Sequence, residues 1–412
     1  SYYTIKQLWS PVQIMNTSVD KQFDGKFSVE NRYDYLNLNT CRFLWKQVKF
    51  PTATDASNTT AQVLKQGEVQ GSDVAAHSAG VLDIKTTILP DADALFLTAI
   101  DRYGHELWRW TFPVNKLNQA NEVLSPLSNK VTSTETENEL TVKAKNHTFI
   151  FSKKDGQLKG VSVNNRKISF ANGPRFIGAR RADRSLDQFY NHDDEKAKEK
   201  DRTYSEFPDA AVFTKLDVKE DGGNLIVTAN YKLGNLDKAQ WTINPSGEAV
   251  LDYTYNFSGV VDLMGICFDY PEDQVISKRW LGAGPYRVWQ NRIHGTQYDV
   301  WENDYNDPIP GETFTYPEFK GYFGSVSWMN IRTKEGTISL TNETPDAYIG
   351  VYQPRDGRDR LLYTLPESGI SVLNVIPPVR NKVNSTDLCG PSSQPKWVNG
   401  PQSGRIIFRF ME

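Results

Sequence analysis

The stretch NLIVTANYKLGNLDKAQWTINPSGEAVLDYTYNF, residues 224–257, decides the fold class of this chain. Apolar and polar residues alternate along NLIVTANYKL and again along AQWTINPSGEAVLDYTYNF, which is the period of a β-strand with one buried face. Within the second stretch, NPSGE at 244–248 supplies the Asn, Pro and Gly that favour a tight turn. The stretch therefore predicts consecutive short strands joined by turns.

The same pattern continues outward in both directions. Further strands are predicted at FSVENRYDYL (27–36), ELTVKAKNHTFIFS (139–152) and GRIIFRF (404–410), with turns at KKDGQ (153–157) and EDGGN (220–224). Helical signals are few, and the charged run DDEKAKEKDR at 193–202 lacks an apolar stripe, so a solvated loop is expected there. So many strands with so little helix predict an all-β chain built of β-sandwiches.

A polar segment divides the chain. NKLNQANEVLSPLSNKVTSTET carries a proline and shows no hydrophobic period, which predicts a linker at 116–136. Residues 1–115 have the size of an immunoglobulin-like sandwich, and residues 137–412 would form a larger, extended sandwich. PPVRNKVNSTDLCGPSSQPKWVNGPQSG, from 377 onward, is rich in Pro, Gly, Ser and Asn and predicts a long loop before GRIIFRF.

Composition excludes several classes of function. The net charge of −3 over 412 residues gives no electrostatic footprint for nucleic acid. No run of eighteen apolar residues is present to span a membrane. The three cysteines are far apart and odd in number, so neither a disulfide framework nor a metal site is predicted. The N-terminus has no signal-peptide pattern and looks like a cut inside a longer chain.

Ordered motifs indicate a family. WLGAGPYRVWQNRIHGTQYDVW (280–301) resembles the Trp-x-Gly-x-Gly-Pro-x-x-x-Tyr-x-Asp-Arg segment in the last domain of the β-galactosidases of glycoside hydrolase family 2. The matching residues are Trp280, Gly282, Gly284, Pro285 and Arg292, while Trp289 replaces the Tyr and Asn291 replaces the Asp. GPRFIGARRADRS (173–185) and YPEFKGYFGSVSWMNI (316–331) are similar to flanking motifs of that domain. The first domain adds Asn31, Tyr33, Tyr35 and Leu38, which resemble a strand of the sandwich that follows the family's catalytic barrel.

This resemblance implies a fold and a role. The expected fold is an immunoglobulin-like β-sandwich followed by a large super-sandwich similar to galactose mutarotase. In the family, two catalytic Glu residues lie on a (β/α)₈ barrel that this chain lacks. The expected function is therefore a non-catalytic C-terminal region that binds carbohydrate and shapes the active site. Its expected partners are a β-galactoside or related glycan and the missing domains of the same polypeptide. Homo-oligomer formation stays open, no cofactor or metal is expected, and a periplasmic or extracellular location is favoured over a cytoplasmic one.

Candidate sugar-binding residues follow from sugar chemistry. Aromatic rings pack against the C–H face of a sugar, and Arg, Asn and charged groups hydrogen-bond its hydroxyls. The family's late loop carries Gly-Gly-x-x-x-Trp, whereas LCGPSSQPKW keeps only Gly390 and places its Trp several residues later. The alternative is architectural, with the 280–301 segment only locking strands together through a Trp core. The predicted carbohydrate-binding residues are Trp289, Asn291, Arg292, His294, Trp301 and Trp397.

No catalytic residue is predicted within this chain. Retaining glycoside hydrolysis needs two carboxyl groups about 5–5.5 Å apart. A chain with 50 acidic residues forms acidic clusters freely, and most of them are solvated or paired with Arg at the surface. The acidic clusters that lie beside aromatics and Arg are Asp183 with Asp187, Asp299 with Glu302 and Asp304, Glu312 with Glu318, and Asp356 with Asp359. Two alternative functions remain open: a stand-alone carbohydrate-binding protein, and an aldose 1-epimerase using a His acid and a Glu base, for which only His294 lies among the motifs.

Overall fold

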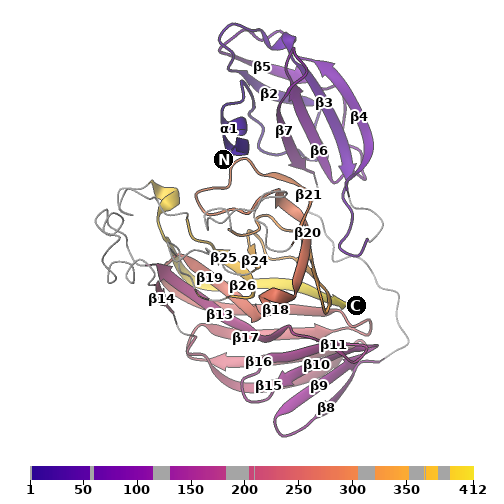
Figure 1. The fold of residues 1–412 in the computed structure, drawn as a ribbon, viewed down its shortest axis with the longest axis vertical. Coiled ribbons are helices and arrows are strands. Elements are labelled where there is room, and N and C mark those ends of the chain that lie inside the picture. The colour runs from indigo at the N-terminus through magenta and orange to yellow at the C-terminus, as the bar shows by residue number, and fades with distance from the viewer. Residues whose placement is uncertain are drawn as a thin grey trace. The chain divides into compact units, whose positions relative to one another are not determined.

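The described chain is built almost wholly of β-strands, which confirms the all-β class and the sandwich architecture (Figure 1). The computed structural model describes residues 2–55, 60–114, 130–181, 204–207, 209–304, 321–351, 366, 368–378 and 390–412. It divides into two compact units. The N-terminal unit comprises 1–122, 281–285 and 293–301, and the C-terminal unit comprises 123–280, 286–292 and 302–412. None of the described helices is long and apolar enough to cross a membrane.

Two antiparallel sheets form the N-terminal unit within the described residues. One sheet has the order β1-β2-β5 and the other β4-β3-β6-β7. The bounds are β1 (Val12–Ile14), β2 (Lys26–Asn31), β3 (Arg42–Lys49), β4 (Gln62–Gln70), β5 (Ser78–Asp83), β6 (Ala94–Ile100) and β7 (Glu106–Pro113). A short helix, α1 (Tyr2–Leu8), precedes β1 and has no buried residue, and a 3₁₀ turn, η1 (Leu38–Thr40), precedes β3.

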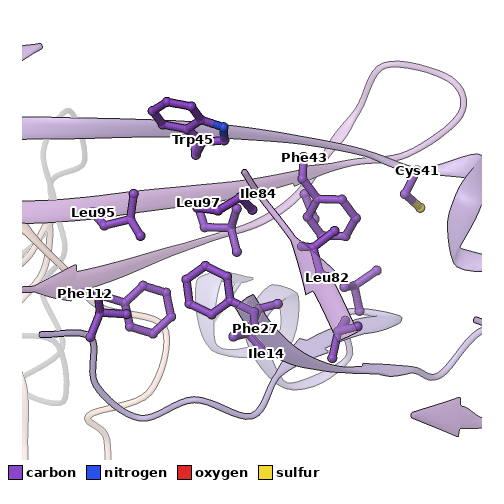
Figure 2. Close-up of a cluster of buried hydrophobic side chains, with 14 of the residues drawn as sticks. Ile14, Phe27, Cys41, Phe43, Trp45, Leu82, Ile84, Leu95, Leu97 and Phe112 are labelled. Carbon is purple, nitrogen blue, oxygen red and sulfur yellow. The ribbon is translucent and has the colours of Figure 1, made fainter. Parts of the chain in front are cut away.

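The core of the N-terminal unit lies between these two sheets (Figure 2). Phe27 of β2 and Phe112 of β7 come from different sheets, and their rings stack with centroids 5.1 Å apart. Leu82 of β5, Phe43 of β3 and Leu97 of β6 are fully buried in the same cluster. The alternation of FSVEN is thereby explained: Phe27 and Val29 of β2 enter this core, whereas Ser28 between them is exposed.

Two larger sheets form most of the C-terminal unit as far as it is described. The first has the order β24-β25-β19-β13-β11-β10-β9-β8, with β12 beside β11 and β14 beside β13. The second has the order β15-β16-β17-β18-β26-β23-β22-β20-β21. The strands of the first sheet are β8 (Thr132–Glu135), β9 (Glu139–Ala144), β10 (His147–Ser152), β11 (Leu158–Val163), β12 (Arg166–Ile168), β13 (Ala171–Arg181), β14 (Tyr204–Glu206), β19 (Leu263–Asp269), β24 (Tyr348–Val351) and β25 (Ile370–Val375). Those of the second are β15 (Val212–Asp221), β16 (Asn224–Lys232), β17 (Leu236–Ile243), β18 (Ala249–Val261), β20 (Val275–Gly284), β21 (Gln297–Asp304), β22 (Trp328–Thr333), β23 (Gly336–Asn342) and β26 (Lys396–Met411). Residues of β20 and β21 fall in both units.

Aromatic side chains from both sheets pack between them. Phe268 of β19, in the first sheet, stacks on Phe170 at 4.6 Å between centroids, and Phe408 of β26, in the second, lies 5.2 Å from Phe170. Trp241 of β17 lies 5.9 Å from Phe408 and is fully buried. The stretch 224–257 forms β16, β17 and most of β18 as antiparallel neighbours, as its alternation predicted.

Two predicted segments differ from the structure. The final strand begins at Lys396 instead of Gly404, so the predicted loop is shorter than expected. Residues 396–403 pair with β18 in a continuous register from Val261↔Lys396, and these hydrogen bonds override the weak strand propensity of VNGPQSG. Thr132–Glu135, inside the predicted linker, form β8 and pair with β9. The charged run at 193–202 lies outside the described residues.

Candidate functional site

A turn between β20 and β21 carries three of the predicted sugar-binding residues in the C-terminal unit. Trp289 and Arg292 close this turn through two backbone hydrogen bonds, Arg292 N to Trp289 O at 2.9 Å and the reverse pair at 3.4 Å. On its N-terminal side, Val288 and Tyr322 exchange backbone hydrogen bonds of 2.7 and 2.8 Å. The turn is thus fixed from two directions, and Asn291 lies at its tip.

The tip of this turn binds the segment that leads into β26. Gln290 Nε2 donates to the carbonyl oxygens of Ser392 (3.0 Å) and Gln394 (2.8 Å). Asn291 Nδ2 donates to Ser393 Oγ at 2.9 Å. Residues 391–393 form a 3₁₀ turn, η6 (Pro391–Ser393), which Pro391 starts in a conformation suited to a helical first turn. Three hydrogen bonds between residues about a hundred positions apart in the sequence therefore hold the turn against this segment.

Trp397 follows four residues after Ser393 and is exposed. It pairs with Val260 across β18 and β26, and 71% of its surface is accessible. A large exposed indole is unusual, because Trp is mostly buried in folded proteins. Gln290 adds an unused acceptor, since no donor among the described residues reaches its buried Oε1. An accessible aromatic face and unpaired amide acceptors are among the groups that bind sugar rings.

Trp289 is placed differently from Trp397. It is 1% exposed and packs in a core cluster with Val288, Tyr322 and Leu373. Its ring meets Tyr322 edge to face, with centroids 5.6 Å apart. In this arrangement Trp289 supports the turn from beneath, which is the architectural alternative that the sequence left open.

The two remaining predicted residues belong to the N-terminal unit. His294 is exposed, and its carbonyl oxygen accepts a hydrogen bond from Thr4 Oγ1 at 3.0 Å. Trp301 is partly buried, and its Nε1 donates to the carbonyl oxygens of Gly282 (3.2 Å) and Gln297 (3.1 Å). A Cβ on Gly284 would collide with the Trp301 ring, so the second glycine of WLGAG allows the indole to lie on the strand.

The acidic cluster at 299–304 has a structural partner. Asp299 Oδ2 accepts a hydrogen bond from Arg109 Nη2 at 2.9 Å, and both side chains are mostly buried. Glu302 and Asp304 are exposed. The other three predicted clusters, Asp183 with Asp187, Glu312 with Glu318 and Asp356 with Asp359, lie outside the described residues.

Sequence reasoning missed a cavity in the C-terminal unit. Its volume is about 450 Å³, and its walls come from β13, β14, β15, β16, β17 and β19 and from the turn after β10. Burial raises the pKa of the Cys267 thiol in this wall to about 11, and the neighbouring Arg175 acts in the opposite direction. No local motif could have indicated the cavity, because its walls come from six strands that are scattered along the sequence and meet only in the folded sheets.

Two solved structures are among the proteins to which this chain is similar. The structure is similar to galactose 1-epimerase from Lactobacillus acidophilus NCFM, with 10% identity, a TM-score of 0.35 and coverage of 69% of this chain and 99% of that one. It is also similar to a mutarotase-like protein from Salmonella typhimurium, with 10% identity, a TM-score of 0.32 and coverage of 71% and 97%. A search of curated protein sequences gave no significant match.

The family model described as the β-galactosidase small chain matches residues 143–375, more than half of the chain. This chain belongs to the β-galactosidase small-chain family. The membership fits the fold described above, since the match runs from β9 to the end of β25 and covers most of both large sheets.

Proposed function

We propose that this chain is the C-terminal, non-catalytic region of a β-galactosidase of glycoside hydrolase family 2, whose catalytic barrel is a separate part of the same polypeptide. Membership in the small-chain family supports this role. The N-terminal unit would be a spacer toward the barrel, and the C-terminal unit would contribute to substrate binding.

The carbohydrate contact is proposed for the surface formed by the turn at 289–292, η6 and Trp397, here called the turn surface. The observation that carries it is the hydrogen bond from Asn291 to Ser393, which holds the turn against the segment leading to the exposed indole. Trp397 would pack against the C–H face of a sugar ring. Asn291 and Arg292 would hydrogen-bond its hydroxyls, because amides and guanidinium groups supply donors in fixed geometry.

Two measurements on the purified chain test this function together. Calorimetry with methyl β-galactoside and with uronic-acid oligomers should detect binding of the galactoside, with a dissociation constant of about 1 mM, typical of one ring on an open surface. Release of nitrophenol from nitrophenyl β-galactoside should be undetectable. Clear turnover would overturn the non-catalytic role. Accelerated mutarotation of freshly dissolved galactose, followed by polarimetry, would replace it with the epimerase function.

A further inference from the structure

The 450 Å³ cavity of the C-terminal unit has the dimensions of a small-molecule site. Pockets that hold small ligands have volumes of about 300–1,000 Å³, so this cavity has room for a single sugar-sized ring. None of its lining residues belongs to the turn surface. Six strands contribute to its walls, and a rigid scaffold of that kind holds binding groups in place before a ligand arrives.

Aromatic rings make up part of the cavity wall. Phe176, Phe207, Phe213 and Tyr231 all line it, and Phe213 meets Tyr231 edge to face with centroids 6.0 Å apart. Gly178 leaves space for two of these rings, because a Cβ there would lie 2.8 Å from Phe176 and 3.3 Å from Phe207. These aromatic rings therefore offer flat apolar surface, which suits the C–H face of a saturated ring.

The cavity wall also carries a guanidinium group, that of Arg175. Among the described residues, Arg175 is hydrogen-bonded to Asp269 and Cys267, and both bonds are made through Nη2. Within the described part of the chain, neither its Nε nor its Nη1 has a hydrogen-bond acceptor, so both donors can serve a ligand. The Asp269 ion pair keeps the side chain in one position, with 35% of its surface exposed. A fixed, half-exposed Arg at a cavity wall is a preorganised donor.

Carboxylates supply the acceptors. Asp209 lines the cavity and is held by backbone N–H groups, Ala211 N at 3.2 Å and Asn235 N at 3.3 Å on Oδ1 and Phe176 N at 3.4 Å on Oδ2. Glu206 is exposed at the same cavity. The charged groups of the lining are Lys154, Arg175, Asp155, Glu206 and Asp209, so negative charge exceeds positive by one.

We propose that this cavity is a binding site for a neutral, polyhydroxylated ring of monosaccharide size. A hydroxyl group donates to a carboxylate and accepts from a guanidinium at the same time, so a polyol matches a wall that carries both. An anionic ligand such as a uronic acid would face the excess of carboxylates, and a purely apolar ligand would leave Arg175 and Asp209 desolvated. The proposal does not rest on the galactosidase role, because its residues and its test are separate.

Methyl NMR on the full chain tests the site directly. Ile177 and Ala211 line the cavity, so their methyl signals should shift on titration with galactose or glucose, while Ile406 of the buried core serves as the reference. We expect a dissociation constant of about 1 mM for the neutral sugars and binding at least about tenfold weaker for galacturonate. No shift at Ile177 and Ala211, or equal affinity for galacturonate, would overturn the proposal.

Matched variants locate the ligand. Arg175→Met should weaken binding at least about tenfold, because it removes the donors but keeps the length of the side chain. Arg405→Met is the control, since Arg405 forms a similarly exposed ion pair with Asp252 at 3.0 Å but does not line the cavity. If Arg175→Met does not fold, Ala211→Phe fills the cavity from a partly exposed position and should abolish the Ile177 shift. Unchanged affinity in the folded cavity variants would refute the site. Trp397→Ala should leave this titration unchanged, so failure here and failure at the turn surface are distinguishable.

Discussion

Arg109 and Asp299 form an ion pair of 2.9 Å across 190 residues of sequence, and both belong to the N-terminal unit. Only 22% of the Arg109 side chain and 16% of the Asp299 side chain are exposed. The guanidinium also lies over the ring of Phe96, 4.7 Å from its centroid. The first sandwich is therefore not encoded by the first 122 residues alone, because a segment from much later in the chain supplies the counter-charge to its β7.

This ion pair should contribute to stability because it is mostly buried. Asp299→Asn leaves the Arg109 charge without a counter-ion and should lower the free energy of unfolding by about 2 kcal/mol, measured by urea denaturation. The double variant Arg109→Met/Asp299→Met should recover most of that loss, because two apolar side chains leave no buried charge unpaired. Glu106→Gln breaks the more exposed pair with Lys6 and should cost about 0.5 kcal/mol or less. Equal losses in the two single variants would contradict this account.

The close approach of Trp301 to Gly284 predicts a packing defect. Gly284→Ala places a methyl group in the indole ring and should cost about 1–3 kcal/mol, with loss of the native Trp fluorescence environment as a second readout. Gly160→Ala on β11 is the control, because a Cβ there meets nothing within 4 Å. If both variants unfold at the same urea concentration, the glycine is not needed for this contact.

Because Trp397 is exposed, replacing it should weaken sugar binding at the turn surface with little effect on the stability of the fold. Trp397→Ala should change the free energy of unfolding by less than about 0.5 kcal/mol, because the side chain is largely in solvent. The affinity of the turn surface for methyl β-galactoside, measured from NMR shifts of the Asn291 side-chain amide, should fall at least about tenfold, while the shifts at Ile177 and Ala211 in the cavity keep their midpoint. Trp9→Ala is the matched control, since Trp9 is also exposed and lies in the other unit. A galactoside affinity that survives Trp397→Ala would place the sugar elsewhere.

The Cys267 thiol predicts a pH dependence. Its pKa is about 11 in the folded chain, mainly because burial disfavours the thiolate, against about 8.5 in an unfolded chain. The folded chain therefore keeps a proton that the unfolded chain loses, so this contribution to stability is complete below about pH 8.5 and falls as the pH rises toward 11. Between about pH 8 and about pH 10.5, wild type should lose about 2 kcal/mol more than Cys267→Ala in urea unfolding.

A second cysteine provides the control for this experiment. Burial also raises the pKa of Cys41, in the N-terminal unit. Cys41→Ala should therefore retain the Cys267 contribution to the alkaline loss of stability. The pH account fails if Cys267→Ala and wild type lose stability in parallel over this range.

Strand positions could be predicted from sequence where one face of a strand is buried. Val227, Trp241 and Leu251 lie side by side on β16, β17 and β18 and are all buried, as their alternation required. Prediction failed at 396–403, where VNGPQSG has poor strand propensity. That part of β26 forms because β18 offers a complete row of hydrogen-bonding partners, which is a property of a distant strand and not of the local residues.

The candidate site was predictable in its residue types and not in their grouping. The family motif located Asn291 and Arg292, and the late loop located Trp397. Nothing in the sequence indicated that Gln290 is hydrogen-bonded to Ser392 of η6 and to Gln394. It also did not indicate that His294 and Trp301 belong to a different unit from Asn291. The cavity of 450 Å³ could not be predicted either, because Arg175 and Tyr231 come from different sheets and line the same cavity only after both sheets have formed.

The sequence by itself determined the all-β class and the family, because period-two alternation and ordered motifs are local properties of the chain. Tertiary structure alone decided which of several chemically equivalent residues became core and which became surface. Trp289 and Trp397 are both tryptophans with polar residues close by in the sequence, yet the Trp289 side chain is 1% exposed and that of Trp397 is 71% exposed. The difference arises because burial depends on which distant strands pack over a side chain, and that is set by the pairing of whole sheets.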